Sequence, residues 1–175
     1  LFQQEVIEDF VCSYENGQTP NPCIECNRRF KFYHLYDKMK EYDCEYIVTG
    51  HYARIGYDEN TGRYLLKKAI DLTKDQSYVL YTMTQYQLAH TIFPLGEYKK
   101  TQVREIADAN GFRNAKKHES QDICFVPDGD YVGFMERYRN KKYPEGKFVD
   151  MQGNYLGKHK GYVHYTIGQR KGLGI

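Results

Sequence analysis

The segment from residue 26 to residue 51 most restricts the fold that this chain can adopt. An apolar stripe at helical spacing over 26–42 precedes a short run of strand-forming residues, 46–49, which leads directly into Gly50-His51. A helix followed by a buried strand that ends in glycine is typical of open α/β sheets, whose ligands lie beyond the carboxyl ends of the strands. The pattern therefore predicts an α/β fold with an open parallel sheet.

Local signals in the rest of the chain predict further helices and a hairpin. Apolar residues recur at helical spacing near the N-terminus, and the two prolines of residues 19–22 forbid a helix until after Pro22. The expected elements are a helix over 2–11 that ends at Glu15-Asn16-Gly17, a hairpin over 52–70 that turns at Asn60-Thr61-Gly62, and helices over 75–90 and 99–110, the last ended by Gly111.

The character of the chain changes after Cys124. A helix over about 129–138 and a basic link over 137–142 lead into a stretch with glycine every few residues, which is typical of short strands in a small β-barrel. We therefore place a domain boundary near residue 130: residues 1–129 belong to the α/β domain, and residues 130–175 form a linker helix and the start of a β-rich domain. Leu1 lies inside a helical pattern and the last residues lack a closing element, so we expect a piece of a longer protein.

Composition restricts the classes of function. The chain has 25 Lys and Arg residues against 23 Asp and Glu, so its net charge of +2 gives no overall basic field for nucleic acid. No apolar run reaches the roughly 18 residues of a membrane helix, and no signal peptide is recognisable. The five cysteines are an odd number without secretory features, which favours a reducing compartment and predicts a cytoplasmic protein without a membrane partner.

Cys23-Ile24-Glu25-Cys26 forms a CxxC motif, for which several interpretations stay open. It could be half of a zinc site, but no second CxxC or CxxH pair follows, so no structural metal is expected. It could be a redox pair, although the prolines precede the motif and the usual strand is missing. The thiols could also be small buried hydrophobes, which is common for single cysteines such as Cys12 and Cys44.

The position of Cys26 at the start of the predicted 26–42 helix favours a reactive thiol. The positive end of the helix dipole and the neighbouring Arg28 and Arg29 would stabilise a thiolate there. Cys124 follows polar residues and precedes Phe125-Val126, which suits a loop-to-strand edge near a pocket. From the residues alone, Cys26 is a functional candidate and the role of Cys124 stays open.

Five motifs resemble those of the tRNA-specific 2-thiouridylase family. They occur in the family's order and at its spacing, and the resemblance covers nearly the whole chain. In sequence order the motifs are TPNPCIECNRRFKF, TGHYAR, DLTKDQSYVLYTM, ESQDICF and YTIGQRKGLGI.

The resemblance implies an adenine nucleotide alpha hydrolase-like ATP-pyrophosphatase domain, followed by a central β domain and a C-terminal β-barrel. It implies an enzyme that uses ATP, with Mg²⁺, to adenylate the C2 carbonyl of the tRNA wobble uridine, and then replaces that oxygen with persulfide sulfur. The implied partners are tRNA and a persulfide sulfur-relay donor protein, and we expect a monomer.

The resemblance also implies roles for individual residues. Cys124 would carry the persulfide, and Cys26, which directly precedes the Asn-Arg-x-x-Lys-Phe stretch, would be its catalytic partner. Gly50 would contact the nucleotide, since a residue without a Cβ lets the backbone approach a ligand closely. The residues implied to contact tRNA are Asn21, Pro22 and Cys23 in the target-base loop, His51, and the segment Lys74, Asp75 and Gln76.

Without the resemblance, these residues have ordinary interpretations. Gly50 would be a turn glycine, His51 a surface or core residue, and Asp75 the cap of a helix. Scattered basic pairs such as Lys99-Lys100 and Lys116-Lys117 would form an RNA surface only if they converge on one side.

One feature of the family is missing. The Ser-Gly-Gly-x-Asp-Ser loop, whose backbone N–H groups would cradle the phosphates of ATP, does not occur in these 175 residues. We therefore expect the chain by itself to be inactive. A tRNA-binding or sulfur-accepting module without catalysis is an alternative function, and a zinc module that uses Cys23 and Cys26 is a further one.

Overall fold

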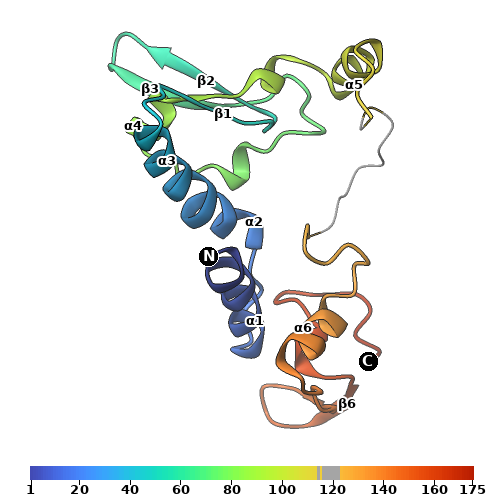
Figure 1. Cartoon of the computed structure of the whole chain (residues 1–175). Helices are drawn as coiled ribbons and strands as arrows, with labels where there is room; N and C mark the ends of the chain where they lie inside the picture. The colour runs from blue at the N-terminus through green and yellow to red at the C-terminus, as the bar shows by residue number, and fades with distance from the viewer. Residues whose placement is uncertain (114, 116–122) are drawn as a thin grey trace. The chain divides into compact units, whose positions relative to one another are not determined.

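The computed structural model describes residues 1–113, 115 and 123–175 (Figure 1). They form two compact units. The first combines Leu1–Glu5 with Cys23–Glu119, and the second combines Val6–Pro22 with Ser120–Ile175. Lys116, Lys117 and the first four residues of the ESQDICF motif lie outside the described residues.

The N-terminal helix follows its predicted pattern. A π-helical turn, η1 (Gln3–Ile7), continues into α1 (Glu8–Glu15), and the helix ends at Asn16 and Gly17. Gly17 has a φ of +71°, a left-handed conformation that glycine adopts without steric cost. The prediction of a helix that residues 15–17 end is therefore confirmed.

The second helix begins earlier than predicted. It runs through α2 (Pro22–Glu25), the π-helical η2 (Cys26–His34) and α3 (Leu35–Glu41). Proline is favoured in the first helical turn because the N–H that it lacks would have no helical partner there. The predicted start at residue 26 is wrong by one turn, and Cys26 lies in the second turn of the helix.

A two-stranded parallel sheet confirms the predicted α/β class. β1 (Ile47–Val48) pairs with β4 (Thr91–Ile92), with Ile47 opposite Thr91. The expectation of a buried strand holds for Ile47 but is wrong for Val48, whose side chain is 62% exposed.

Two further local predictions are confirmed in the first unit. β2 (Ala53–Asp58) and β3 (Arg63–Lys68) form an antiparallel hairpin that turns at Gly62, whose φ is +64°. α5 (Lys100–Ala109) covers the predicted 99–110 helix, and Gly111 follows it in the left-handed conformation.

The predicted helix over 75–90 is wrong. The segment forms a short 3-10 turn, η3 (Ser77–Val79), and a separate helix, α4 (Gln85–Ala89). Thr84 and Gln87 form a capping box, in which each side chain accepts the backbone N–H of the other residue. This box starts a new helix at a point where the prediction had a helix interior.

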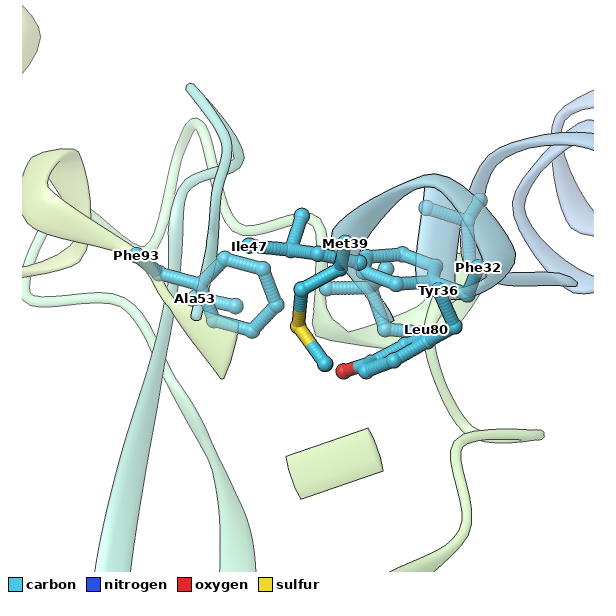
Figure 2. Packing of buried hydrophobic residues seen from close by; sticks show 8 residues of the cluster. Phe32, Tyr36, Met39, Ile47, Ala53, Leu80 and Phe93 are labelled. Carbon is cyan, nitrogen blue, oxygen red and sulfur yellow. The ribbon is translucent and has the colours of Figure 1, made fainter. Parts of the chain in front are cut away.

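The core of the first unit joins the second helix to the strands. Figure 2 shows the packed side chains. The buried members of this core are Phe32, Tyr36, Met39, Ile47, Ala53, Val79, Leu80 and Phe93. Burying one large apolar side chain of this kind contributes about 1.5–3 kcal/mol. At η4 (Pro94–Glu97), a Cβ on Gly96 would lie 1.8 Å from the carbonyl oxygen of Ala53, so only glycine fits there.

The second unit contains the predicted linker helix and glycine-punctuated strands. α6 (Tyr131–Arg139) begins after Asp130, whose carboxylate accepts the N–H of Gly133 at 2.9 Å. β5 (Gly146–Val149) and β6 (Tyr155–His159) form an antiparallel pair with a bulge.

The remaining turn of this unit, η5 (Tyr162–His164), packs into the same core as α1 and α6. The buried side chains of this core are Phe10, Val11, Tyr14, Val132, Met135, Tyr143 and Val163. In the part of the chain that the structure describes, no helix has the length and apolar character needed to cross a bilayer.

Candidate functional site

The loop predicted to contact the target base continues into the second helix. Pro22 is buried as the first residue of α2, whereas Asn21 and Cys23 are exposed. Cys23, not Cys26, therefore occupies the first turn, where the partial positive charge of the helix end is strongest. The interpretation of Cys26 as a first-turn thiol is wrong.

Cys26 lies half-buried at the start of the π-helical stretch η2. The guanidinium groups of Arg28 and Arg29 both pair with the carboxylate of Glu25, at 2.6 and 2.8 Å. Because this carboxylate offsets their charge, the two arginines stabilise a thiolate less than the sequence suggested. Stretches of π-helix are rare and frequently occur at functional sites, so the position of Cys26 keeps it a candidate.

Asn27 is a residue that sequence reasoning missed. Its side chain is 3% exposed, and its Nδ2 donates to the backbone carbonyl of Cys23 at 2.9 Å. Its Oδ1 is buried and has no hydrogen-bond partner among the described residues. Such acceptors are rare because leaving one unsatisfied costs about 1–3 kcal/mol. The available sequence signal was an asparagine, a weak helix former, in the middle of a helix directly after Cys26.

Gly50 lies two residues after the end of β1 and is exposed. A Cβ at this position would meet only Cδ1 of Leu95, at an ordinary contact distance of 3.6 Å, and the residue does not have a positive φ. The packing of the described residues therefore does not require glycine here, in contrast to Gly96. The open space beside the backbone is what the close approach of a ligand needs.

His51 is buried, with its ring against those of Phe32 and Phe93. Its Nδ1 shares a hydrogen bond of 2.8 Å with Oγ1 of Thr49. Burial, and to a smaller extent the charge of Lys31, lowers the pKa of His51 to about 4. The imidazole is therefore neutral at neutral pH.

Residues 74–76 are held against Tyr52 by a pair of hydrogen bonds. The N–H of Tyr52 donates to Oε1 of Gln76 at 3.0 Å, and the N–H of Gln76 donates to the carbonyl oxygen of Tyr52 at 2.8 Å. Asp75 accepts the N–H of Ala69 at 2.8 Å, so it closes the end of the hairpin, and its interpretation as a helix cap is wrong. Because Tyr52 directly follows His51, these bonds bring residues 74–76 close to His51 in the chain.

Cys124 lies in a turn of the second unit with its side chain exposed. The N–H of Val126 donates to the carbonyl of Ile123 at 2.8 Å, and Ile123 and Phe125 pack against the core. The flanking residues are therefore anchored while the thiol faces outward. The expected loop-to-strand edge is wrong, because the chain continues from this turn into α6.

Comparison with known proteins covers both parts of the chain. Residues 1–128 match the family model described as the tRNA methyl transferase HUP domain, and residues 132–175 match the tRNA methyl transferase PRC-barrel domain. Over all 175 residues, the chain is 53% identical to the tRNA-specific 2-thiouridylase MnmA of Clostridioides difficile and 54% identical to that of Moorella thermoacetica. The chain belongs to the tRNA-specific 2-thiouridylase family. It spans about half the length of these curated relatives, 48% and 49%.

The two units of this chain divide the predicted site residues between them. Asn21, Pro22 and Cys124 belong to the second unit, and the other predicted site residues belong to the first. The pairing of Cys26 with Cys124 therefore stays a prediction, as does the domain boundary near residue 130. Across the described residues, which include all five cysteines, no disulfide is formed.

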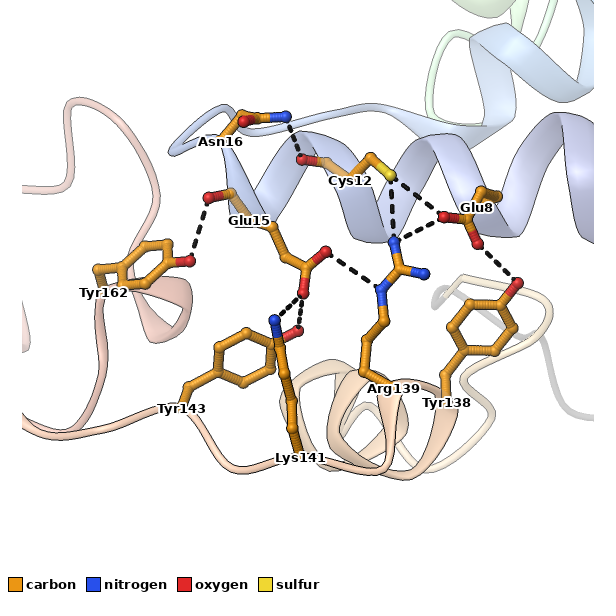
Figure 3. Close-up of polar contacts among 9 residues, drawn as sticks. All are labelled: Glu8, Cys12, Glu15, Asn16, Tyr138, Arg139, Lys141, Tyr143 and Tyr162. Atoms are coloured by element: carbon orange, nitrogen blue, oxygen red, sulfur yellow. Dashed lines mark hydrogen bonds and ion pairs between the residues drawn. The ribbon is translucent and has the colours of Figure 1, made fainter.

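A different thiol, Cys12, is held by two side-chain contacts (Figure 3). Its Sγ donates to Glu8 at 3.2 Å and accepts from Arg139 at 3.1 Å. The hydrogen bond to Glu8 and burial raise the pKa of Cys12, which keeps the thiol protonated. Arg139 and Lys141 of the predicted basic link pair with Glu15, so these charges serve the fold.

Proposed function

We propose that the protein containing this chain thiolates tRNA by replacing the C2 oxygen of the wobble uridine with sulfur. One observation carries the proposal: the 53% identity to a tRNA-specific 2-thiouridylase extends over the whole chain, which holds both thiols that the chemistry needs. ATP would supply the adenylyl group that turns the C2 oxygen into a leaving group.

Cys124 is suited to carry the sulfur as a persulfide, because its thiol is exposed in an anchored turn that a donor protein can reach. The terminal sulfur of the persulfide attacks C2 of the activated uridine, and the oxygen leaves with the adenylyl group as AMP. Cys26 then attacks Sγ of Cys124, which breaks the S–S bond, releases 2-thiouridine and forms a Cys26–Cys124 disulfide that a reductant must reset. In the alternative, Cys26 serves only as an acid or base, and an external thiol breaks the S–S bond and leaves a mixed disulfide on Cys124.

The proposed tRNA contacts combine hydrogen bonds with charge. The target base has to leave the anticodon stack to reach a thiol, and Asn21, Pro22 and Cys23 would receive it. His51 would act as a neutral hydrogen-bonding group, because its lowered pKa leaves it uncharged. Lys74, Asp75 and Gln76 would form one tRNA-contacting segment. In it, Lys74 would contact phosphate and the Nε2 of Gln76 would donate to a base.

Gly50 is the one residue of this chain that we assign to nucleotide binding. The space beside its backbone fits a close approach by an adenylate, since no packing of the described residues fills it. The phosphate loop is absent from these residues, and within the described ranges no group of three or more His, Cys, Asp or Glu could hold a metal ion. The phosphate and Mg²⁺ contacts are therefore not assigned to residues of this chain.

Four serine substitutions in the intact protein test the thiol chemistry. Cys26→Ser and Cys124→Ser should each abolish 2-thiouridine in tRNA, measured by mass spectrometry of digested tRNA. Cys12→Ser and Cys44→Ser are the matched controls and should leave thiolation largely intact. Normal thiolation in either of the first two variants would contradict the roles proposed for the pair.

The missing phosphate loop favours a second function for this chain in isolation, namely tRNA or sulfur binding without catalysis. The isolated chain should show no ATP-dependent chemistry, whereas the intact protein should bind ATP. Calorimetric titration of ATP into both proteins separates the two cases. Turnover of ATP by the isolated chain would exclude the binding-module alternative.

A further inference from the structure

Lys99 and Lys100 stand at the start of α5, a position that does not favour cations. The N-terminal end of a helix carries partial positive charge and prefers acidic residues, yet the first turn of α5 contains none. Lys99 is exposed, and within the described ranges neither ammonium group forms an ion pair. Local helix electrostatics therefore do not explain why two lysines occupy this position.

The structure holds Lys100 beside the candidate tRNA-contacting residues. Its N–H donates to Oδ2 of Asp71 at 3.0 Å, and its Nζ lies 5.1 Å from the centre of the Tyr52 ring. Tyr52 is the residue that pairs with Gln76. Asp71 also accepts the N–H and hydroxyl of Thr73, so its carboxylate is engaged by the backbone around it.

Tyr52 provides a second, independent observation. Its side chain is 6% exposed, and its hydroxyl is buried without a hydrogen-bond partner in the described part of the chain. A buried hydroxyl that lacks a partner is costly, and an incoming acceptor would satisfy it. The same ring thus carries an unsatisfied donor and contacts a cation, and a phosphate oxygen suits both.

We propose that Lys100, with Lys99 beside it, binds a backbone phosphate of tRNA next to the contacts made by residues 74–76. The inference rests on the proposed function and adds a binding element to it. Lys100 contributes charge, and the Tyr52 hydroxyl contributes a directional hydrogen bond. This contact positions the RNA without reading its sequence.

The salt dependence of RNA binding tests the proposal in the intact protein. Lys100→Ala should lower the magnitude of the slope of log K against log[salt] by about 0.7–0.9, the value for one phosphate contact. At about 0.1 M salt this decrease in slope corresponds to a five- to eight-fold loss of affinity for an anticodon stem–loop RNA. Lys100→Arg keeps the charge, so its affinity and its salt slope should both stay close to those of the wild type.

Lys40 is a matched control. It lies in the last turn of α3, where the helix dipole favours a cation, and its Nζ is 5.7 Å from the ring centre of Tyr86. Lys40→Ala should leave the affinity and the slope unchanged. An unchanged slope in Lys100→Ala, or an equal change in Lys40→Ala, overturns the inference. If the intact wild-type protein does not thiolate tRNA in a parallel assay, that result would instead contradict the proposed function.

Discussion

Two polar parts of this chain are built in opposite ways. Between α1 and α6, charged groups meet opposite charges: Arg139 donates to Glu8 at 2.6 Å and to Glu15 at 3.1 Å, and Tyr143 donates to Glu15 at 3.0 Å (Figure 3). This set of contacts is called the α1–α6 network below. Its polar groups find their partners within the second unit, and their role is explained by the fold alone.

The first unit leaves several polar groups without partners. Oδ1 of Asn27 and the hydroxyl of Tyr52 are buried and unsatisfied among the described residues, and the ammonium of Lys100 contacts a ring instead of a carboxylate. Folding alone gains nothing from such groups, since each unsatisfied buried atom costs free energy. The α1–α6 network is therefore explained by structure, whereas the unsatisfied groups of the first unit fit the RNA binding proposed above.

Removing the central cation of the α1–α6 network should destabilise the second unit. Arg139→Met leaves the carboxylates of Glu8 and Glu15 without their shared partner. Exposed ion pairs contribute about 0.2–1 kcal/mol each, and Arg139 joins two partly exposed pairs, so the expected loss is about 1–2 kcal/mol. Denaturant unfolding of the chain measures this free energy.

Arg137 on the same helix is the control for this prediction. Its side chain is 64% exposed, and its nearest carboxylate is that of Asp128 at 3.8 Å. Arg137→Met should change the free energy of unfolding by less than about 0.5 kcal/mol. Equal losses in the two variants would mean that the α1–α6 network adds nothing beyond an ordinary surface pair.

His51 should make the first unit sensitive to acid. Its pKa is about 4 in the folded state against an ordinary value of 6.5, so between these values the unfolded chain binds a proton that the folded chain does not. The contribution of His51 to stability is therefore present well above pH 6.5 and is lost as the pH falls, by about 1.5 kcal/mol between pH 6.5 and pH 5. Unfolding of wild type and His51→Gln at both pH values should show a smaller acid loss in the variant. The same acid loss in both would contradict the neutral buried state of His51.

Sequence reasoning succeeded where the signal is local. The helix that ends at Gly17, the hairpin that turns at Gly62 and the helix followed by Gly111 depend on periodicity and on glycine conformation, which neighbouring residues determine. The parallel sheet was also predictable from the order of helix and strand. Recognition of the motifs, and not local physics, singled out Cys124.

Two of the missed features have local signals, and the others depend on tertiary contacts. The capping box at Thr84, a local pattern, divides the expected 75–90 helix, and Pro22 starts a helix because proline is favoured in the first helical turn. Asp75 is used by the hairpin instead of by a helix. The burial of His51 and the unsatisfied oxygen of Asn27 depend on segments distant in sequence, which no local pattern records.

Asn27→Leu should separate function from stability. The change removes the hydrogen bond to Cys23, which costs about 1 kcal/mol, but also removes an unsatisfied buried oxygen, so we expect a net change within about 1 kcal/mol of either sign. Because Asn27 directly follows Cys26, thiolation by the intact variant should fall, as read by mass spectrometry of digested tRNA. The control is Gln87→Leu, whose amide is satisfied by Thr84 and Phe32 and whose loss should destabilise the chain by about 1–2 kcal/mol. A large destabilisation by Asn27→Leu would show that this asparagine is structural.

Gly50→Ala should have the smallest effect on stability. An added Cβ meets only Leu95 at 3.6 Å and the backbone has no positive φ, so the free energy of unfolding should change by less than about 0.5 kcal/mol. Gly96→Ala adds the same methyl group 1.8 Å from the carbonyl of Ala53 and should destabilise the chain by about 3 kcal/mol. The affinity of the intact protein for ATP should fall in Gly50→Ala despite its normal stability. A stable Gly50→Ala variant with wild-type ATP affinity would remove Gly50 from the nucleotide site, because the space beside it would then serve neither packing nor binding.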